Sequence, residues 1–174
     1  ACPPKSESFC DPEAWKHGGG SIWMTGSYDP QLNLTYWGVG NVGPDYAGAQ
    51  RPGDNLYTAS IVALDADKGT IRWHSQFTPH DVEDRDATEP NVLVDRVYKG
   101  KPSRLLLHAD RNGYFYVLDR VTGEFLSGTP YVRNITWATG LTPQGRPIVA
   151  PNTEPTREGR RVCPSIEGAS NWYS

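Results

Sequence analysis

The sequence predicts an all-β fold. Nowhere in its 174 residues do apolar side chains recur with the spacing of a long amphipathic helix. Short runs rich in β-forming residues are instead separated by glycine, proline, asparagine and aspartate, the residues that interrupt strands. One strand-turn-strand unit also occurs twice, and such internal repetition is typical of repeated β architectures.

The chain is expected to be a single segment, with a loop at 1–17 and strands and loops over 18–174. Three prolines interrupt regular structure within the first 17 residues. A first strand is predicted at 32–36, where apolar and polar residues alternate after the turn signature Tyr28-Asp29-Pro30-Gln31. A long loop is predicted at 42–56, and ordered loops of this length usually have a functional role.

The repeated unit covers 63–73 in its first copy and 117–127 in its second, an offset of 54 residues. Both copies read as an apolar residue, Leu, Asp, three further residues, Gly and a returning strand. This offset suits one four-stranded propeller blade with a long loop. The alternative is that these are two ordinary, unrelated Asp-x-x-x-Gly hairpins, and two copies are too few to exclude it.

Between the two copies, strands are predicted at 104–109 and 114–118. Asn112-Gly113 lies in the connection between them, and this dipeptide is the strongest short hairpin signal. The pair is therefore interpreted as an inner hairpin of a blade. Residues 138–161 show little periodicity and are predicted to form an extended surface loop.

Composition narrows the class of protein. A hydrophobic content of 37%, with 18 Gly and 15 Pro, indicates a soluble, loop-rich chain. No apolar run approaches the ~20 residues of a membrane span. The net charge of −3 argues against a nucleic-acid partner, which would require a basic face.

Three cysteines are present, an odd number. Cys2 and Cys10 are close enough in sequence to form a disulfide across a short loop, which leaves Cys163 over. Three reduced thiols are the alternative, since spacing does not determine connectivity.

A first candidate site lies near the start of the chain. Three consecutive glycines at 18–20 let the backbone approach another group closely, and Ser21 and Trp23 follow them. Asn41 supplies a neutral amide oxygen after a predicted strand. An aromatic platform with a nearby amide oxygen suits a planar cofactor beside a metal ion. A core tryptophan and a turn asparagine are the ordinary alternatives.

Further candidate residues follow. Asp84 and Asp86 lie in the acidic run 80–86, which otherwise reads as a solvated charged loop. Arg111 lies in the predicted hairpin turn, where arginine is normally a surface residue. The pair Asn171-Trp172 lies near the end of the chain. No zinc-type Cys/His spacing, Gly-x-Ser-x-Gly elbow or phosphate-binding glycine loop occurs.

In this order, the motifs resemble those of the quinoprotein alcohol dehydrogenases, from about Trp15 to Trp172. These are eight-bladed β-propellers that carry pyrroloquinoline quinone (PQQ) and a metal ion. The resemblance implies about three blades of four antiparallel strands, with the remaining blades as partners. Trp73 matches the family's tryptophan-docking repeat, whereas the second copy has Ser127 at that position.

The resemblance also implies cofactor and metal contacts. Trp23 would lie flat on the quinone and Ser21 would hydrogen-bond to it. Asn41 would give its side-chain oxygen to the metal. Asn171 and Trp172 match a cofactor-contacting position late in the family sequence.

The catalytic roles come from the same resemblance. Asp84, preceded by the family's Thr-Pro-His-Asp lead-in, would be the general base and also a metal-binding residue, and Arg111 would stabilise charge on the quinone. Asp86 matches an additional metal ligand of lanthanide-dependent members, and calcium is the alternative ion. Glu83 and Arg85 depart from the family, because they replace aromatic walls of the substrate pocket.

As a whole, the resemblance implies an oxidoreductase that oxidises a small alcohol or sugar hydroxyl and passes electrons to a cytochrome c-type haem acceptor. It implies a periplasmic or secreted protein, a signal peptide outside this chain, and Cys163 paired with a cysteine outside it. The chain alone is expected to be inactive. A non-catalytic propeller scaffold is the main alternative, and a carbohydrate-binding all-β module is another.

Overall fold

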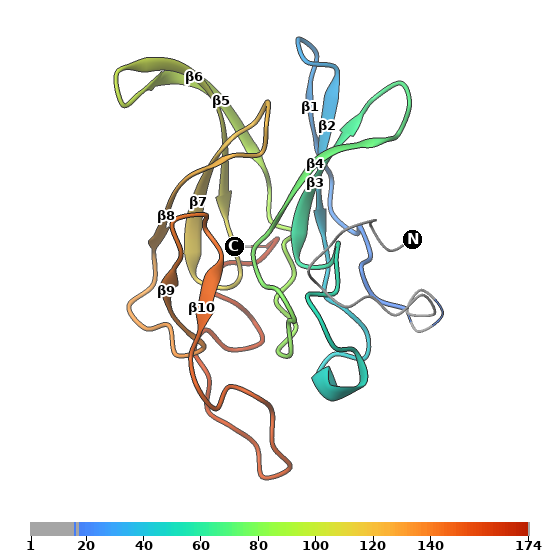
Figure 1. Cartoon of the computed structure of the whole chain (residues 1–174), viewed down its shortest axis with the longest axis vertical. Coiled ribbons are helices and arrows are strands. Elements are labelled where there is room, and N and C mark those ends of the chain that lie inside the picture. The colour runs from blue at the N-terminus through green and yellow to red at the C-terminus, as the bar shows by residue number, and fades with distance from the viewer. Residues whose placement is uncertain (1–15, 17, 174) are drawn as a thin grey trace.

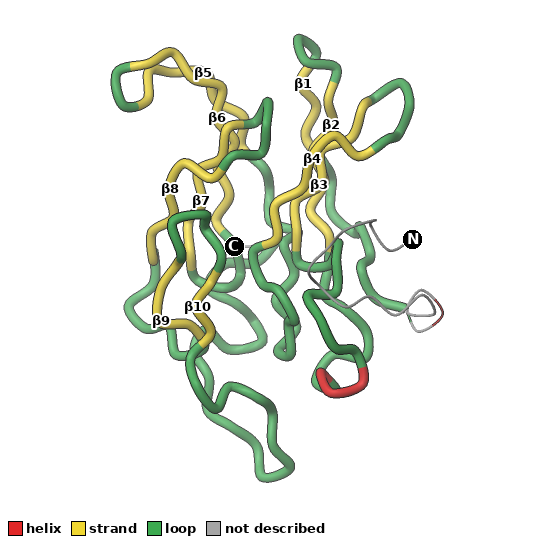
Figure 2. Tube along the Cα trace, in the orientation of Figure 1, coloured by secondary structure: helices red, strands yellow, loops and turns green. Residues whose placement is uncertain are grey.

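The computed structural model describes residue 16 and residues 18–173. It contains two four-stranded antiparallel sheets standing side by side and one two-stranded hairpin (Figures 1 and 2). Among the described residues the one named helix is a single 3₁₀ turn, η2 (Gly48–Gln50), so the prediction of an all-β chain is confirmed. No described helix has the length and apolar character needed to cross a bilayer.

Each four-stranded sheet is an antiparallel meander whose strands pair in sequence order. The first sheet consists of β1 (Ser27–Asp29), β2 (Leu34–Val39), β3 (Ser60–Asp65) and β4 (Ile71–Gln76). The second consists of β5 (Val92–Tyr98), β6 (Lys101–Ala109), β7 (Tyr114–Asp119) and β8 (Phe125–Pro130). The hairpin pairs β9 (Ala138–Leu141) with β10 (Pro147–Val149).

The two repeats have the same strand register. Ala63 pairs with Trp73 and the register then shifts, and Val117 pairs with Ser127 before the same shift. In the first turn Gly69 N donates to Asp65 O at 2.8 Å, and Gly123 N donates to Asp119 O at 2.8 Å in the second. Unrelated hairpins would not be expected to share both a bulge and a turn, so the two units are a true repeat.

Trp73 joins the two sheets. Its Nε1 donates to Arg120 O at 3.2 Å, and its ring lies against Gly123 in the turn of the second sheet. The Tyr36 hydroxyl donates to the same Arg120 carbonyl at 2.9 Å. The second copy has no such docking ring. Ser127 instead accepts a 3.0 Å hydrogen bond from Tyr98 within its own sheet.

The hydrophobic core lies between the two sheets and is rich in aromatic rings. Phe77 and Tyr116 have ring centroids 4.3 Å apart, and Tyr36 and Trp73 lie 5.7 Å apart. Both sheets and the segments that follow them contribute to one buried cluster. The loops that connect these strands are therefore attached to a well-packed core.

Some predicted boundaries are wrong. The strand predicted at 32–36 is β2, which begins at Leu34 and extends to Val39. The predicted loop 138–161 contains β9 and β10. Gly145, at φ 84°, lies against the ring of Phe125, so this hairpin is stabilised by packing that periodicity does not reveal. The 110–113 turn is confirmed, and β6 and β7 are the central strands of their sheet.

About three blades were predicted. The described residues form two complete four-stranded sheets and, in addition, the two-stranded β9–β10 hairpin. The predicted loop at 1–17, with Cys2 and Cys10, lies outside the described residues apart from residue 16. Cys163 is a free thiol whose Sγ lies 3.2 Å from Asn134 O.

Candidate functional site

The glycine run lies antiparallel to the segment that follows β2. Gly20 N donates to Asn41 O at 2.6 Å, and Gly40 N donates to Ser21 O at 2.9 Å. A Cβ on Gly19 would lie 2.3 Å from Gly43 N, and Gly19 has φ 93°. Glycine is required here by close backbone approach and by a left-handed conformation.

This pairing places Trp23 at the surface and not in the core. Its side chain is 42% exposed, and its ring meets that of Trp172, 53% exposed, edge to face at 6.5 Å. Ser21 is also exposed. The core interpretation of Trp23 is wrong, because a large aromatic face is left uncovered where a planar ligand could stack.

The acidic run is buried, so the interpretation of it as a solvated loop is wrong. Of residues 81–89, Asp84 is the one that is not buried. The Asp81 carboxylate accepts hydrogen bonds from Glu83 N at 3.0 Å and Arg85 N at 2.6 Å. This tight turn holds Asp84 at φ 60°, so its side chain is presented while its neighbours face inward.

The structure brings Asp84, Asp86 and Arg111 together. Arg111 forms an ion pair with Asp86 and lies 3.9 Å from Asp84. Asp86 Oδ1 also accepts a 2.7 Å hydrogen bond from Asn41 N. Burial and then the charge of Asp86 raise the pKa of Asp84 to about 6, and Arg111 opposes this.

An oxygen-rich cluster surrounds these residues. Asn41 Nδ2 donates to the Asp45 carboxylate, and Asp45 and Asp81 add to the negative potential at Asp84. Arg51 fastens the 42–56 loop to the acidic run through the carbonyls of Asp45 and Asp81. Carboxylate oxygens gathered in this way are ligands that a hard cation prefers.

Glu83 and Arg85 form a buried pair with each other. Arg85 also lies 3.8 Å from the Asp81 carboxylate and sits 4.6 Å from the centre of the Trp137 ring. The two charges thus neutralise each other within the loop, and neither leaves an unpaired charge beside Asp84.

The end of the chain closes one side of the site. Arg111 donates to Ile166 O, and Ala169 N donates to Arg111 O at 3.0 Å. Asn171 is buried, and its Oδ1 accepts from Trp172 N at 2.9 Å. Asn171 thus shapes the turn that sets Trp172 near Trp23.

Sequence reasoning missed three supporting residues, namely Asp81, Asp45 and Trp137. Asp81 and Asp45 lay in segments already singled out, but only the fold shows which carboxylates cap a turn. Trp137 carried no signal, because its partner Arg85 is 52 residues away in sequence.

Two four-stranded antiparallel sheets joined by a docked tryptophan are blades of a β-propeller, and polar loops and exposed rings gather at one end of them. The chain belongs to the PQQ family, described as the glucose/ethanol/alcohol dehydrogenase β-propeller domain, whose profile matches residues 3–132.

Relatives and solved structures agree. The quinoprotein alcohol dehydrogenase PedH of Pseudomonas putida is 47% identical over 92% of this chain and 28% of its own length. A europium-containing methanol dehydrogenase superposes with a TM-score of 0.87 at 37% identity, over 94% of this chain and 29% of that one. The crystal structure of the quinohemoprotein alcohol dehydrogenase from Comamonas testosteroni superposes with a TM-score of 0.84 at 41% identity, over 89% of this chain and 23% of that one. The chain therefore spans about a quarter of these relatives.

Proposed function

We propose that this chain is the part of a PQQ-dependent dehydrogenase that carries the catalytic base and one wall of the cofactor site. The complete protein would oxidise a small alcohol or sugar hydroxyl. When bound, PQQ accepts the hydride and the metal ion acts as a Lewis acid. The observation that carries the proposal is the presentation of Asp84, beside Arg111, from an otherwise buried loop.

Each residue has a distinct role in this proposal. Asp84 takes the hydroxyl proton of the substrate, since a general base must be accessible and near its proton. Arg111 supplies a fixed positive charge toward the cofactor oxygens. Trp23 forms the platform for the ring system and Ser21 hydrogen-bonds at its edge, with Asn171 and Trp172 at the adjoining wall.

Asn41, Asp84 and Asp86 would hold the metal ion. A second carboxylate favours a trivalent lanthanide over calcium, because the more highly charged ion gains more from it. The similarity to a europium-containing enzyme supports this choice. Arg111 pairs with Asp86 in this structure, so an ion would share that carboxylate, whose oxygens each have two lone pairs.

Reconstitution of the complete protein tests the proposal. The metal-free protein is loaded with PQQ and either lanthanum or calcium, and dye reduction is measured with primary alcohols and with sugars. We expect turnover with at least one substrate class, higher with lanthanum, and loss of the lanthanum advantage in Asp86→Ala. Full activity with calcium, no gain with lanthanum and no effect of Asp86→Ala would overturn the metal assignment.

Location and partners follow from the same proposal. Electrons would leave to a cytochrome c-type acceptor in the periplasm, in keeping with relatives named as quinohemoproteins. Cys163 would pair with a cysteine elsewhere in the complete protein, and Cys2 with Cys10. Mass mapping of disulfides in the secreted protein tests both pairings.

A further inference from the structure

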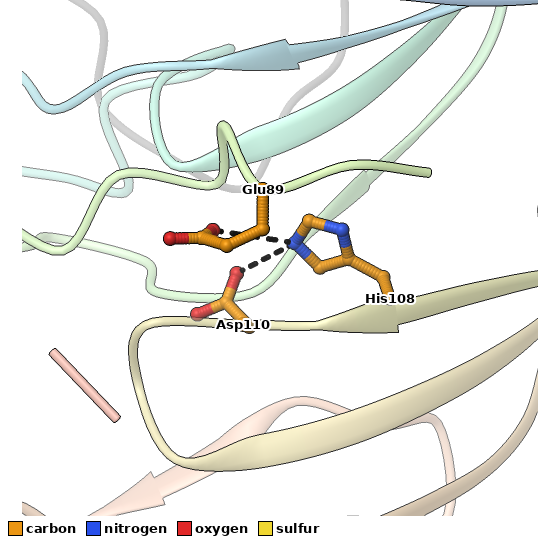
Figure 3. Close-up of side chains that lie close together, drawn as sticks. All are labelled: Glu89, His108 and Asp110. Atoms are coloured by element: carbon orange, nitrogen blue, oxygen red, sulfur yellow. Dashed lines mark hydrogen bonds and ion pairs between the residues drawn. The ribbon is translucent and has the colours of Figure 1, made fainter. Parts of the chain in front are cut away.

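Three buried side chains of the kinds that bind metal ions point toward one another (Figure 3). His108 lies on β6, Asp110 follows that strand directly, and Glu89 reaches in from the segment before β5. His108 Nε2 lies 3.2 Å from Asp110 Oδ2 and 3.8 Å from Glu89 Oε2. One donor atom from each residue lies within 4.8 Å of the others.

These side chains are shielded from solvent and only partly satisfied. The exposed fractions are 4% for Glu89, 1% for His108 and 0% for Asp110. Neither carboxylate oxygen of Glu89 has a hydrogen-bond partner among the described residues, and His108 Nδ1 also has none. An unpaired buried carboxylate is costly, so the cluster needs a compensating group.

The described cations do not supply that compensation directly. The ion pairs that the described residues make with Glu89 or Asp110 come from His108, which belongs to the same cluster. Arg111, the nearest arginine in sequence, is paired with Asp86 and Asp84. Two carboxylates and a neutral imidazole balance the charge of one divalent cation.

We propose that Glu89, His108 and Asp110 bind a divalent transition-type metal ion, zinc by ligand chemistry. Zinc lies about 2.0–2.2 Å from nitrogen and oxygen ligands, so two ligands of a tetrahedral site are about 3.4 Å apart. The separations of 3.2 and 3.8 Å bracket that value. Coordination of the ion by Glu89 would give its unpaired carboxylate a partner.

The donor set separates this site from the one at Asp84. An imidazole nitrogen favours zinc and its neighbours, whereas calcium and lanthanide ions prefer oxygen alone. Phe77 stacks on the imidazole, with centroids 4.9 Å apart and planes 14° apart, and so fixes the ring. The ion would tie the segment before β5 to the turn that carries Arg111.

Metal content of the complete protein tests this without any activity assay. The protein is folded in medium supplemented with zinc, desalted and examined by elemental mass spectrometry. We expect about one zinc per chain in the wild type and in Glu124→Gln, an exposed glutamate in the β7–β8 turn, and loss of zinc in Glu89→Gln.

A second measurement covers the case in which Glu89→Gln fails to fold. Chelator-treated wild type is heated with added zinc or calcium, and we expect zinc alone to raise the melting temperature by several degrees. Wild type that contains no zinc after folding in zinc-supplemented medium, and that melts at the same temperature with and without zinc, would overturn the proposal. Protons would then neutralise the cluster.

Discussion

Asp84 shows how a short turn can present one functional group. Its neighbours are held by the Asp81 carboxylate and by the Glu83–Arg85 pair, so the loop has little freedom to move. The sequence predicted a charged loop at 80–86. The burial of its side chains in the structure shows that Asp84 is the acidic residue of this loop that solvent can reach.

Asp84→Asn in the complete protein should reduce turnover by at least about 10²-fold, the range expected on removal of a general base. Bound PQQ should be retained, because the shape of the side chain is unchanged. The measurement is dye reduction together with the PQQ absorbance of the purified variant. Asp67→Asn, in an exposed turn, is the matched control. Near-normal turnover of Asp84→Asn would place the base elsewhere.

The pair of Asp29 and Arg120 predicts a dependence of stability on pH. Arg120 Nε lies 2.7 Å from Asp29 Oδ2 and joins β1 to β5, where it also binds Asp95. Burial raises the pKa of Asp29, but the hydrogen bonds from Arg120 and from the backbone of Leu32 and Gln31 outweigh it, and the pKa lies below 3.8.

Because that pKa is lowered on folding, the pair stabilises the fold above the unfolded pKa, and the contribution is lost as the pH falls through the lower folded value. Asp29→Asn should cost about 1.5–3 kcal/mol at pH 7, the range for a lost hydrogen bond between charged groups, because Arg120 keeps Asp95 as a partner. The cost should shrink below about pH 3.8. Urea unfolding at pH 7 and pH 3 measures both. An equal cost at the two pH values would contradict this assignment.

At the scale of elements, the two repeats provide a matched experiment on blade docking. Gly69 and Gly123 occupy equivalent turns with φ 64° and 79°. A Cβ on Gly69 meets nothing within 4 Å, whereas one on Gly123 would lie 2.7 Å from the Trp73 ring.

Gly69→Ala should therefore cost about 1–2 kcal/mol from backbone strain alone. Gly123→Ala should cost about 1–3 kcal/mol more, because it also displaces the docked ring. Chemical unfolding followed by tryptophan fluorescence gives both values. Equal costs for the two variants would mean that Trp73 docking contributes little to stability.

The sequence predicted the local features of the elements and missed those set by distant contacts. The turns at Asp65 and Asp119, and the hairpin at Asn112-Gly113, follow from local turn chemistry and were predicted correctly. The β9–β10 hairpin was missed, because it depends on Phe125 and Gly145 meeting across the fold.

The candidate site likewise has residues that the sequence predicted and contacts that only the fold reveals. The order of the motifs selected Trp23, Asn41, Asp84 and Arg111, and the structure brings them to one end of the sheets. The Arg111–Asp86 pair could not be read from the sequence, because it depends on how the two blades meet.

At the scale of the molecule, the chain spans 28% of the length of PedH, and the rings of Trp23 and Trp172 are exposed. The isolated 174-residue chain should therefore show no dye reduction with PQQ, metal and an alcohol. Open sheet edges also favour its association. Steady turnover by the purified chain would contradict this expectation.

Titration of the metal-free complete protein with PQQ and metal measures whether this chain helps to bind PQQ through an exposed tryptophan platform. The absorbance spectrum should show stoichiometric bound PQQ in the wild type, and Trp23→Ala should lower retention by at least about tenfold, given the stacking of a planar group on an aromatic face. A wild-type protein that binds no PQQ with either calcium or lanthanum would contradict the account and favour a non-catalytic propeller scaffold.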